Sequence, residues 1–446
     1  MPTIPHVATT LQTLLGPVAD CAAAATGFVQ RRSKLTGARF VQMLVFGWLA
    51  QPQARLSQLA QAAATVGVPI TPQGVDQRFS PASADCLREV LEQAVQTVLA
   101  ADPVAVPVLQ RFGHVVVQDC TTVPLPAALA AVWPGCGGSS AASGAAALKL
   151  GVRLDLATGQ VSGPHVEAGR TNDRATTIAR LPLAPGIVRL ADLGFFSVAE
   201  LAEQDASGVY WLSRLQAGTA LFTPDGQRQE VLALLEQAGT TVLDQPVRVG
   251  ATQRLACRLL HPEGTRRVPQ EVADQRRRRL RATARRKGET VSPTRLALCG
   301  WTVLLTNVPP DRLTLREALV VLRARWQIEL LFKLWKSHHA LDEWRTANPW
   351  RILTEVYAKL IAVIVQQWLI LVSCWRYPDR SLVKAAQALQ AHALHLAATI
   401  DRFDAVCQAL AIVVRCLTAC GRLARRKTMP STAHRLLALD REAGLA

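Results

Sequence analysis

No Cys-x-x-Cys pair occurs among the ten cysteines, which are scattered along the chain from Cys21 to Cys420. This distribution argues against a zinc knuckle and against the disulfide framework of a short secreted module. Reduced thiols in a reducing compartment are the simpler interpretation. The N-terminus also carries no basic segment followed by a cleavage site, so it does not resemble a signal peptide. We therefore expect a cytoplasmic protein.

Long apolar runs are equally scarce. Only residues 356–375 approach a membrane span in length and composition, and Lys359, Gln366 and Gln367 interrupt them. Each of these side chains is costly in hydrocarbon. The segment is more typical of a buried helix, and we expect no membrane association.

Acidic residues are few, with 33 Asp and Glu against 50 Lys and Arg and a formal net charge of +17. This balance favours a polyanionic partner, nucleic acid before anionic membrane. The excess is concentrated in residues 251–300, which hold thirteen basic residues against four acidic ones. Half of the chain is apolar, and 446 residues exceed what one core usually supports, so we expect a folded protein of several domains.

Residues 1–105 repeat apolar positions every three or four residues, which predicts helices. Four basic residues in this region suit DNA contact or, equally, the surface of a packing module: Arg31, Arg32, Lys34 and Arg39. The pattern then changes to an α/β order, with strands predicted at 114–123, 147–163 (a hairpin) and in a short apolar run from 186 that ends at Asp192, and with a helix at 172–181. Asp119 and Asp192 fall at or near strand ends, where open α/β sheets place their sites.

A third acidic position lies in an apolar helix predicted over Arg323–Lys336, "RARWQIELLFKLWK". At about 100° per residue, Arg325, Glu329 and Lys336 fall within about 40° of one another. The three carboxylates at 119, 192 and 329 would repel each other if they were clustered without cations. With one or two divalent metals they form a phosphoryl-transfer site, and their hard oxygen atoms suit Mg²⁺ or Mn²⁺.

These motifs resemble those of the DDE transposases of bacterial insertion sequences. The spacing R-x3-E-x6-K in "RWQIELLFKLWK", with "QDCTTVPLP" and "ADLGFF", is most similar to the group with the Y-R-E-K signature. The resemblance extends to "LTGARFVQML", to "GRTND" at 169–173 and to "LLTNVP". It departs from the signature at Leu322, where the group has a tyrosine, and this puts one phosphate contact in question.

The resemblance implies an α/β fold: an RNase H-like catalytic domain interrupted by a β-rich insertion and flanked by helical domains. The expected segments are 1–105 (helical, DNA-binding), 106–215 and 301–375 (the two catalytic parts), 216–300 (basic insertion) and 376–446 (helical). Asp119, Asp192 and Glu329 are then the catalytic, metal-binding triad. The expected DNA-contacting residues are Arg325, Lys333, Lys336, Trp301, Arg276, Arg277, Arg278 and Arg279.

Several of these residues allow a plainer interpretation. Glu329 could pair with Arg325 and Lys333 along the helix. Trp301, expected to open the strand after the insertion, holds a flipped base in the family interpretation but is core in the general one. The run from Arg276 to Lys287 is either a phosphate contact or a solvated helical face.

The resulting hypothesis is a cut-and-paste transposase, a homodimer on the paired terminal inverted repeats of an element, acting on nucleoid DNA. The helical tail with its basic "GRLARRK" is the candidate for dimer or DNA contacts. A metal-dependent nuclease on the same fold and a catalytically inactive, sequence-specific DNA-binding protein remain the alternatives.

Overall fold

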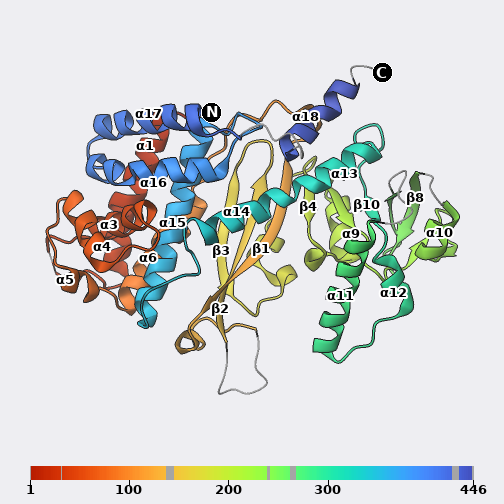
Figure 1. Cartoon of the computed structure of the whole chain (residues 1–446), viewed down its shortest axis with the longest axis horizontal. Helices are drawn as coiled ribbons and strands as arrows, with labels where there is room; N and C mark the ends of the chain where they lie inside the picture. Colours follow the sequence, from red (N-terminus) through yellow and green to blue (C-terminus); the bar gives the residue numbers. More distant parts are fainter. Residues whose placement is uncertain are drawn as a thin grey trace. The chain divides into compact units, whose positions relative to one another are not determined.

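The computed structural model describes residues 2–31, 33–136, 145–238, 242–261, 268–423 and 431–443, which form two compact units (Figure 1). Unit 1 comprises 1–106, 119–180 and 326–434, and unit 2 comprises 107–118, 181–325 and 435–446. The first and last helical regions therefore share one unit, and the unit boundaries differ from those expected at 105 and 375. The two parts that were predicted as separate helical domains pack together.

Unit 1 is mostly helical. Its N-terminal elements are α1 (Ile4–Thr13), η1 (Leu14–Val18), α2 (Ala19–Ala25), α3 (Gly37–Ala50), α4 (Leu56–Thr65), α5 (Pro72–Asp76) and α6 (Pro81–Gln96). Its C-terminal elements are α14 (Trp326–Ser337), α15 (Pro349–Ser373), α16 (Leu382–Thr399) and α17 (Phe403–Cys420), followed by α18 (Thr432–Ala443), which continues into the last segment of unit 2. Thr3, Thr36, Thr71 and Ser80 each accept a backbone N–H at a helix start, so the sequence sets these boundaries locally.

Helix α15 runs through this unit and contacts α1, α3, α6, α16 and α17 (Figure 1). It is apolar and long enough to cross a membrane, but its most apolar stretch is completely buried. The expected buried helix is thus confirmed. Helix α17 also passes the test of length and composition, with 28% of its most apolar stretch buried.

The β structure of unit 1 consists of β2 (Ala146–Asp155), β3 (Val161–Ala168) and the second half of β1 (Val115–Leu125). Strands β2 and β3 form the predicted antiparallel hairpin. The helix predicted over 172–181 is a 3-10 turn, η3 (Asp173–Ala175), followed by one short helix, α8 (Thr177–Arg180). Thr176 in extended conformation separates the two.

Unit 2 is built on a sheet whose order is β1-β4-β5-β10-β9-β8-β6-β7. Strands β4 (Val188–Ala191) and β5 (Tyr210–Arg214) run parallel to the first half of β1, and the rest of the sheet is antiparallel. The further strands are β6 (Leu221–Phe222), β7 (Arg228–Gln229), β8 (Leu243–Val249), β9 (Leu255–His261) and β10 (Leu304–Thr306). This large mixed sheet with its helices confirms the α/β class.

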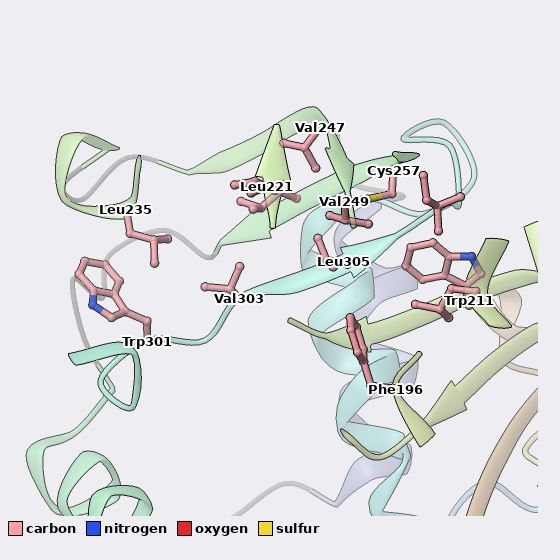
Figure 2. Close-up of a cluster of buried hydrophobic side chains, with 13 residues drawn as sticks. Phe196, Trp211, Leu221, Leu235, Val247, Val249, Cys257, Trp301, Val303 and Leu305 are labelled. Atoms are coloured by element: carbon pink, nitrogen blue, oxygen red, sulfur yellow. The ribbon is translucent and has the colours of Figure 1, made fainter. Parts of the chain in front are cut away.

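The segment predicted as β-rich, 216–300, also contains three helices: α10 (Val231–Ala238), α11 (Gln270–Lys287) and α12 (Pro293–Leu298). Its strands extend the sheet, since β9 pairs with β10. The remaining helical elements of unit 2 are α7 (Pro107–Gln110), η4 (Leu193–Phe195), α9 (Val198–Ala206) and α13 (Leu315–Ala324). A hydrophobic cluster joins the insertion to α9 and β5 and includes Trp211, Leu235, Leu259 and Trp301 (Figure 2).

Candidate active site

Asp119 was expected at or near a strand end, but it is the fifth of the eleven residues of β1, in the part that belongs to unit 1. The preceding valines are buried, whereas Asp119 is only partly buried, and its Oδ1 accepts the backbone N–H of Cys120 at 2.8 Å. Burial, with the Asp173 carboxylate adding to it, raises the pKa of the Cys120 thiol to about 12. Cys120 is therefore a neutral thiol near pH 7, and Asp119 is the hard-oxygen donor at this point of the strand.

The apolar helix predicted over Arg323–Lys336 is divided in two. Helix α13 ends at Ala324, Arg325 forms its C-terminal cap, and α14 begins at Trp326. Arg325 itself keeps helical dihedral angles (φ −51°, ψ −31°). The expectation of a single helix is wrong in this respect, and Arg325 belongs to unit 2 while Glu329 and Lys336 belong to unit 1.

Helix α14 is attached to β1 within unit 1. Lys336 Nζ donates to the carbonyl oxygen of Thr122 at 2.8 Å, three residues after Asp119. Glu329 lies two turns before Lys336 and therefore on the same side of the helix, partly buried. Lys333 is exposed. Glu329 on α14 and Asp119 on β1 therefore lie on two elements that Lys336 links.

Asp192 directly follows β4 in unit 2 and stands in an extended conformation before η4. Its side chain is 50% exposed, and its Oδ1 lies 3.9 Å from an Nη atom of Arg325, whose own side chain is 14% exposed. The largely buried arginine side chain therefore ends beside a half-exposed carboxylate that follows a strand. This contact joins two residues of the predicted motifs that are 133 positions apart in the sequence.

The three carboxylates are drawn from both units, so neither unit contains the set by itself. Among the residues that the structure describes, no group of three or more His, Cys, Asp or Glu side chains is arranged to hold a metal ion. The donor chemistry nevertheless suits a divalent cation, because carboxylate oxygens are hard ligands and Asp192 is accessible. The metal-binding triad stays a prediction.

The basic run forms helix α11, and its arginines divide into two groups. Arg276 donates to the carbonyl oxygens of Trp301 (2.9 Å) and Cys299 (3.3 Å), and Arg277 donates to that of Leu296 and pairs with Asp274. Burial, reinforced by the neighbouring Arg214, lowers the pKa of Arg276. These two arginines hold α11 against the segment around α12. Among the side chains of this helix that the structure describes, the exposed basic ones are Arg278, Arg279, Arg281 and Arg285.

Trp301 lies in the three-residue stretch before β10 rather than opening the strand, and it is 6% exposed. Figure 2 shows its ring among the side chains of the hydrophobic cluster, and the ring of His261 packs against it in a T-shaped arrangement. A base could stack on it only if that cluster opened, so packing accounts for the position. The exposed tryptophan near the motif is Trp326, 55% exposed at the start of α14. The sequence carries a signal for this exposure: Trp326 stands three residues before Glu329 and therefore on the same side of the helix as the charged residues.

The basic residues of the N-terminal region are partly engaged. Arg39 forms an ion pair with Asp401 at 2.6 Å and donates to Gln42, whereas Arg31 and Lys34 are exposed. Arg32 and most of the basic tail motif, residues 424–427, lie outside the described residues.

A net charge of +17, an arginine beside a strand-end aspartate and a helix with glutamate and lysine on one side are typical of α/β enzymes that act on phosphodiesters. Comparison with known proteins is specific: the Transposase DDE domain family matches residues 110–365. The transposase for insertion sequence element IS231B of Bacillus thuringiensis subsp. berliner is 27% identical over 362 residues, 76% of this chain and 74% of the relative.

Two further relatives agree with this match. The transposase for insertion sequence element IS231F of Bacillus thuringiensis subsp. israelensis is 28% identical over 366 residues, 76% of this chain and 74% of its own. The transposase for insertion sequence element IS1151 of Clostridium perfringens is 24% identical over 377 residues, which cover 78% of this chain and 76% of the relative. The chain belongs to the DDE transposase family. It is an insertion-sequence transposase, an enzyme of DNA cleavage and strand transfer, in a family that generally uses a divalent metal.

Proposed function

We propose that Asp119, Asp192 and Glu329 together bind the divalent metal, Mg²⁺ with Mn²⁺ as a substitute, on an RNase H-like catalytic fold. The contact between Arg325 and Asp192 carries this proposal. A half-exposed carboxylate gains little stability from a cation 3.9 Å away. A largely buried arginine beside a strand-end carboxylate supports a separate role for each group: the carboxylate as a ligand of the metal, and the guanidinium as a contact of the DNA phosphate that the metal would bind.

The reaction needs no covalent protein–DNA intermediate. In the first step the oxygen of water forms a bond to the phosphorus that joins element and flank, and the 3′ oxygen of the element leaves as a hydroxyl. In the second step this 3′-hydroxyl attacks another phosphodiester, so that one phosphorus–oxygen bond forms as one breaks. When bound, the metal activates the attacking group and stabilises charge on the leaving oxygen.

The cations of the chain neutralise the phosphates that surround the reacting one. Arg325 and Lys336 are assigned to phosphates of the element end, and the exposed Lys333 to the adjacent backbone. Exposed Arg278 and Arg279 of α11 contact DNA farther along. Arg276 and Arg277 drop out of this set, because their guanidinium groups are used within the protein.

The two ends of an element must be joined together, so we propose a homodimer on paired terminal inverted repeats, with target DNA as the last substrate. The region 376–446 remains the candidate for contacts between protomers or with DNA. The enzyme acts on nucleoid DNA in the cytoplasm. Attack on the opposite strand to form a hairpin and attack on target DNA directly are both compatible with this chemistry.

A cleavage and joining assay tests the catalytic set. Purified protein is incubated with Mg²⁺ and a duplex that spans the inverted repeat flanking the gene and its adjoining DNA. Wild type should cut at the repeat boundary. Asp119→Asn, Asp192→Asn and Glu329→Gln should bind this duplex with wild-type affinity and cut it at least about 100-fold more slowly.

The same assay separates the two rivals. A nuclease on this fold would cut and leave no joined product, and an inactive DNA-binding descendant would bind the repeat equally well without Mg²⁺ and never cut. Normal cutting by any one of the three carboxylate variants would remove that residue from the proposed set.

A further inference from the structure

Helix α15 contains a buried ion pair for which the proposed chemistry has no use. Lys359 Nζ lies 2.6 Å from Glu355 Oε1, and the two side chains are 1% and 6% exposed. The same ammonium group donates to the carbonyl oxygens of Ala340 at 2.7 Å and Glu343 at 3.1 Å. An ammonium has three donors, so these three acceptors satisfy it completely.

The carbonyl groups that Lys359 holds belong to the segment between α14 and α15. Ala340 is one of two non-glycine residues with a positive φ among those described, with φ at 46°. Side chains with a Cβ atom disfavour this left-handed conformation. The carbonyl oxygen of Ala340 accepts both from Lys359 and from the backbone N–H of Glu343 at 3.1 Å. The buried lysine therefore holds a turn that would not be stable by local preference.

A second polar contact ties the same segment to α15. His339 Nε2 lies 2.9 Å from Gln366 Oε1, and both side chains are buried. Burial lowers the pKa of His339 to about 4, so the ring is neutral near pH 7. Gln366 follows Lys359 by seven residues, which places the two on one side of α15. That side faces the end of α14.

The segment that is held in this way is the direct continuation of the helix that carries Glu329. The backbone N–H of Leu341 donates to the carbonyl oxygen of Trp335 in the last turn of α14. One residue beyond Trp335, Lys336 reaches Thr122 on β1. The α15 contacts therefore fix the C-terminal end of α14 close to its attachment to β1.

We propose that Lys359, together with Glu355, is a positioning residue for the reaction. The pair holds α14 in the position, along its own helix axis, in which Glu329 and Lys336 act. This inference rests on the proposed catalytic role of Glu329. Stability alone does not explain the pair, because a well-packed apolar pair of similar volume is often as stable or more stable. Burial raises the pKa of Glu355 and lowers that of Lys359, which shows the unfavourable side of keeping charges here.

The decisive variant is the double substitution Lys359→Met with Glu355→Leu in the full-length protein. Removing both charges leaves no unpaired ion, so the loss of stability should be limited to the two hydrogen bonds from Lys359 to the carbonyl oxygens of Ala340 and Glu343, and the turn at Ala340 loses its side-chain donor. At saturating repeat-containing duplex, we expect single-turnover cleavage to slow by about 10- to 100-fold, because a displacement of about 1 Å can have that effect. The dissociation constant for the duplex should stay within about threefold of wild type.

Two single variants complete the test. Gln366→Met opens the contact to His339 and should slow cleavage in the same manner; it also serves if the double variant does not fold. Gln367→Met is the matched control, because Gln367 is the next residue of α15 and donates instead to the carbonyl oxygen of Gly159 at 2.7 Å. It should alter stability without altering the cleavage rate of the folded protein.

The failure modes are distinguishable. Loss of cleavage in Glu329→Gln with wild-type cleavage in a stable double variant would overturn the positioning inference and leave the catalytic set intact. Normal cleavage in Glu329→Gln would overturn the catalytic set itself. A double variant that slows cleavage no more than Gln367→Met does, or only by weakening DNA binding, would also refute the positioning role.

Discussion

Replacing Arg325 by methionine should affect catalysis more strongly than stability. Methionine retains most of the apolar stem and removes the guanidinium. The ion pair with Asp192 is long, at 3.9 Å, and its carboxylate is half exposed. Such pairs contribute about 0.2–1 kcal/mol, so the loss of this contact accounts for at most about 4 °C of the change in melting temperature.

The catalytic effect should be much larger. A positioned cation that stabilises charge developing in the transition state contributes about 2.7–4 kcal/mol, or 10²- to 10³-fold in rate. We therefore expect Arg325→Met to slow single-turnover cleavage of the repeat-containing duplex by about that factor. Thermal melting monitored by circular dichroism measures the stability, and gel-resolved cleavage at saturating protein measures the rate.

Arg258→Met is the matched control, because it should lower the stability strongly and leave the cleavage rate unchanged. Arg258 pairs with Asp244 and also donates to the carbonyl oxygens of Val308 and Leu313, with its side chain 11% exposed. Loss of this buried cation should destabilise by about 3–5 kcal/mol and leave the cleavage rate of the folded protein unchanged. If Arg325→Met destabilised as strongly as Arg258→Met, or cut at the wild-type rate, the assignment of Arg325 to a phosphate would be refuted.

Two further predictions concern unit 2. The double variant Arg278→Ala with Arg279→Ala should reduce the slope of log affinity against log salt by up to about 2, close to 0.9 for each phosphate that is no longer neutralised. Arg276→Met should instead lower the melting temperature and leave that slope unchanged, and equal slopes for both variants would contradict the division of α11. Burial acts to raise the pKa of Glu317, but hydrogen bonds from Arg111 and Thr314 outweigh it and hold the pKa below the usual 4.5. This stabilisation is present above pH 4.5 and is lost as the pH falls through the lowered value, so urea titrations should show Glu317→Gln less stable than wild type at pH 7, with a difference that shrinks below pH 4.5; a difference independent of pH would contradict it.

The coarse fold could be predicted because hydrophobic periodicity reports burial locally. The strand around Asp119, the β2–β3 hairpin and the buried α15 all follow directly from it. Periodicity does not report where a helix ends when neither glycine nor proline marks the end. Arg325 keeps helical dihedral angles although α13 stops there, so the division between α13 and α14 leaves no trace in the pattern. The joining of residues 1–106 with 326–434 depends on contacts between distant segments, which no local pattern contains.

The basic insertion shows a different limit of sequence reasoning. Twelve residues of α11 contain eight basic side chains, so the helix lacks an apolar stripe that would reveal which side packs. In the structure, the packed side of α11 is formed by arginines that donate to backbone carbonyl oxygens: Arg276 donates to that of Trp301, and Arg277 to that of Leu296. Guanidinium groups can hydrogen-bond inside a protein as readily as they bind phosphate. Charge density therefore indicated a nucleic-acid partner for the chain, but it could not assign the individual arginines. That assignment needed the carbonyl acceptors, which are absent from the side-chain pattern of any sequence.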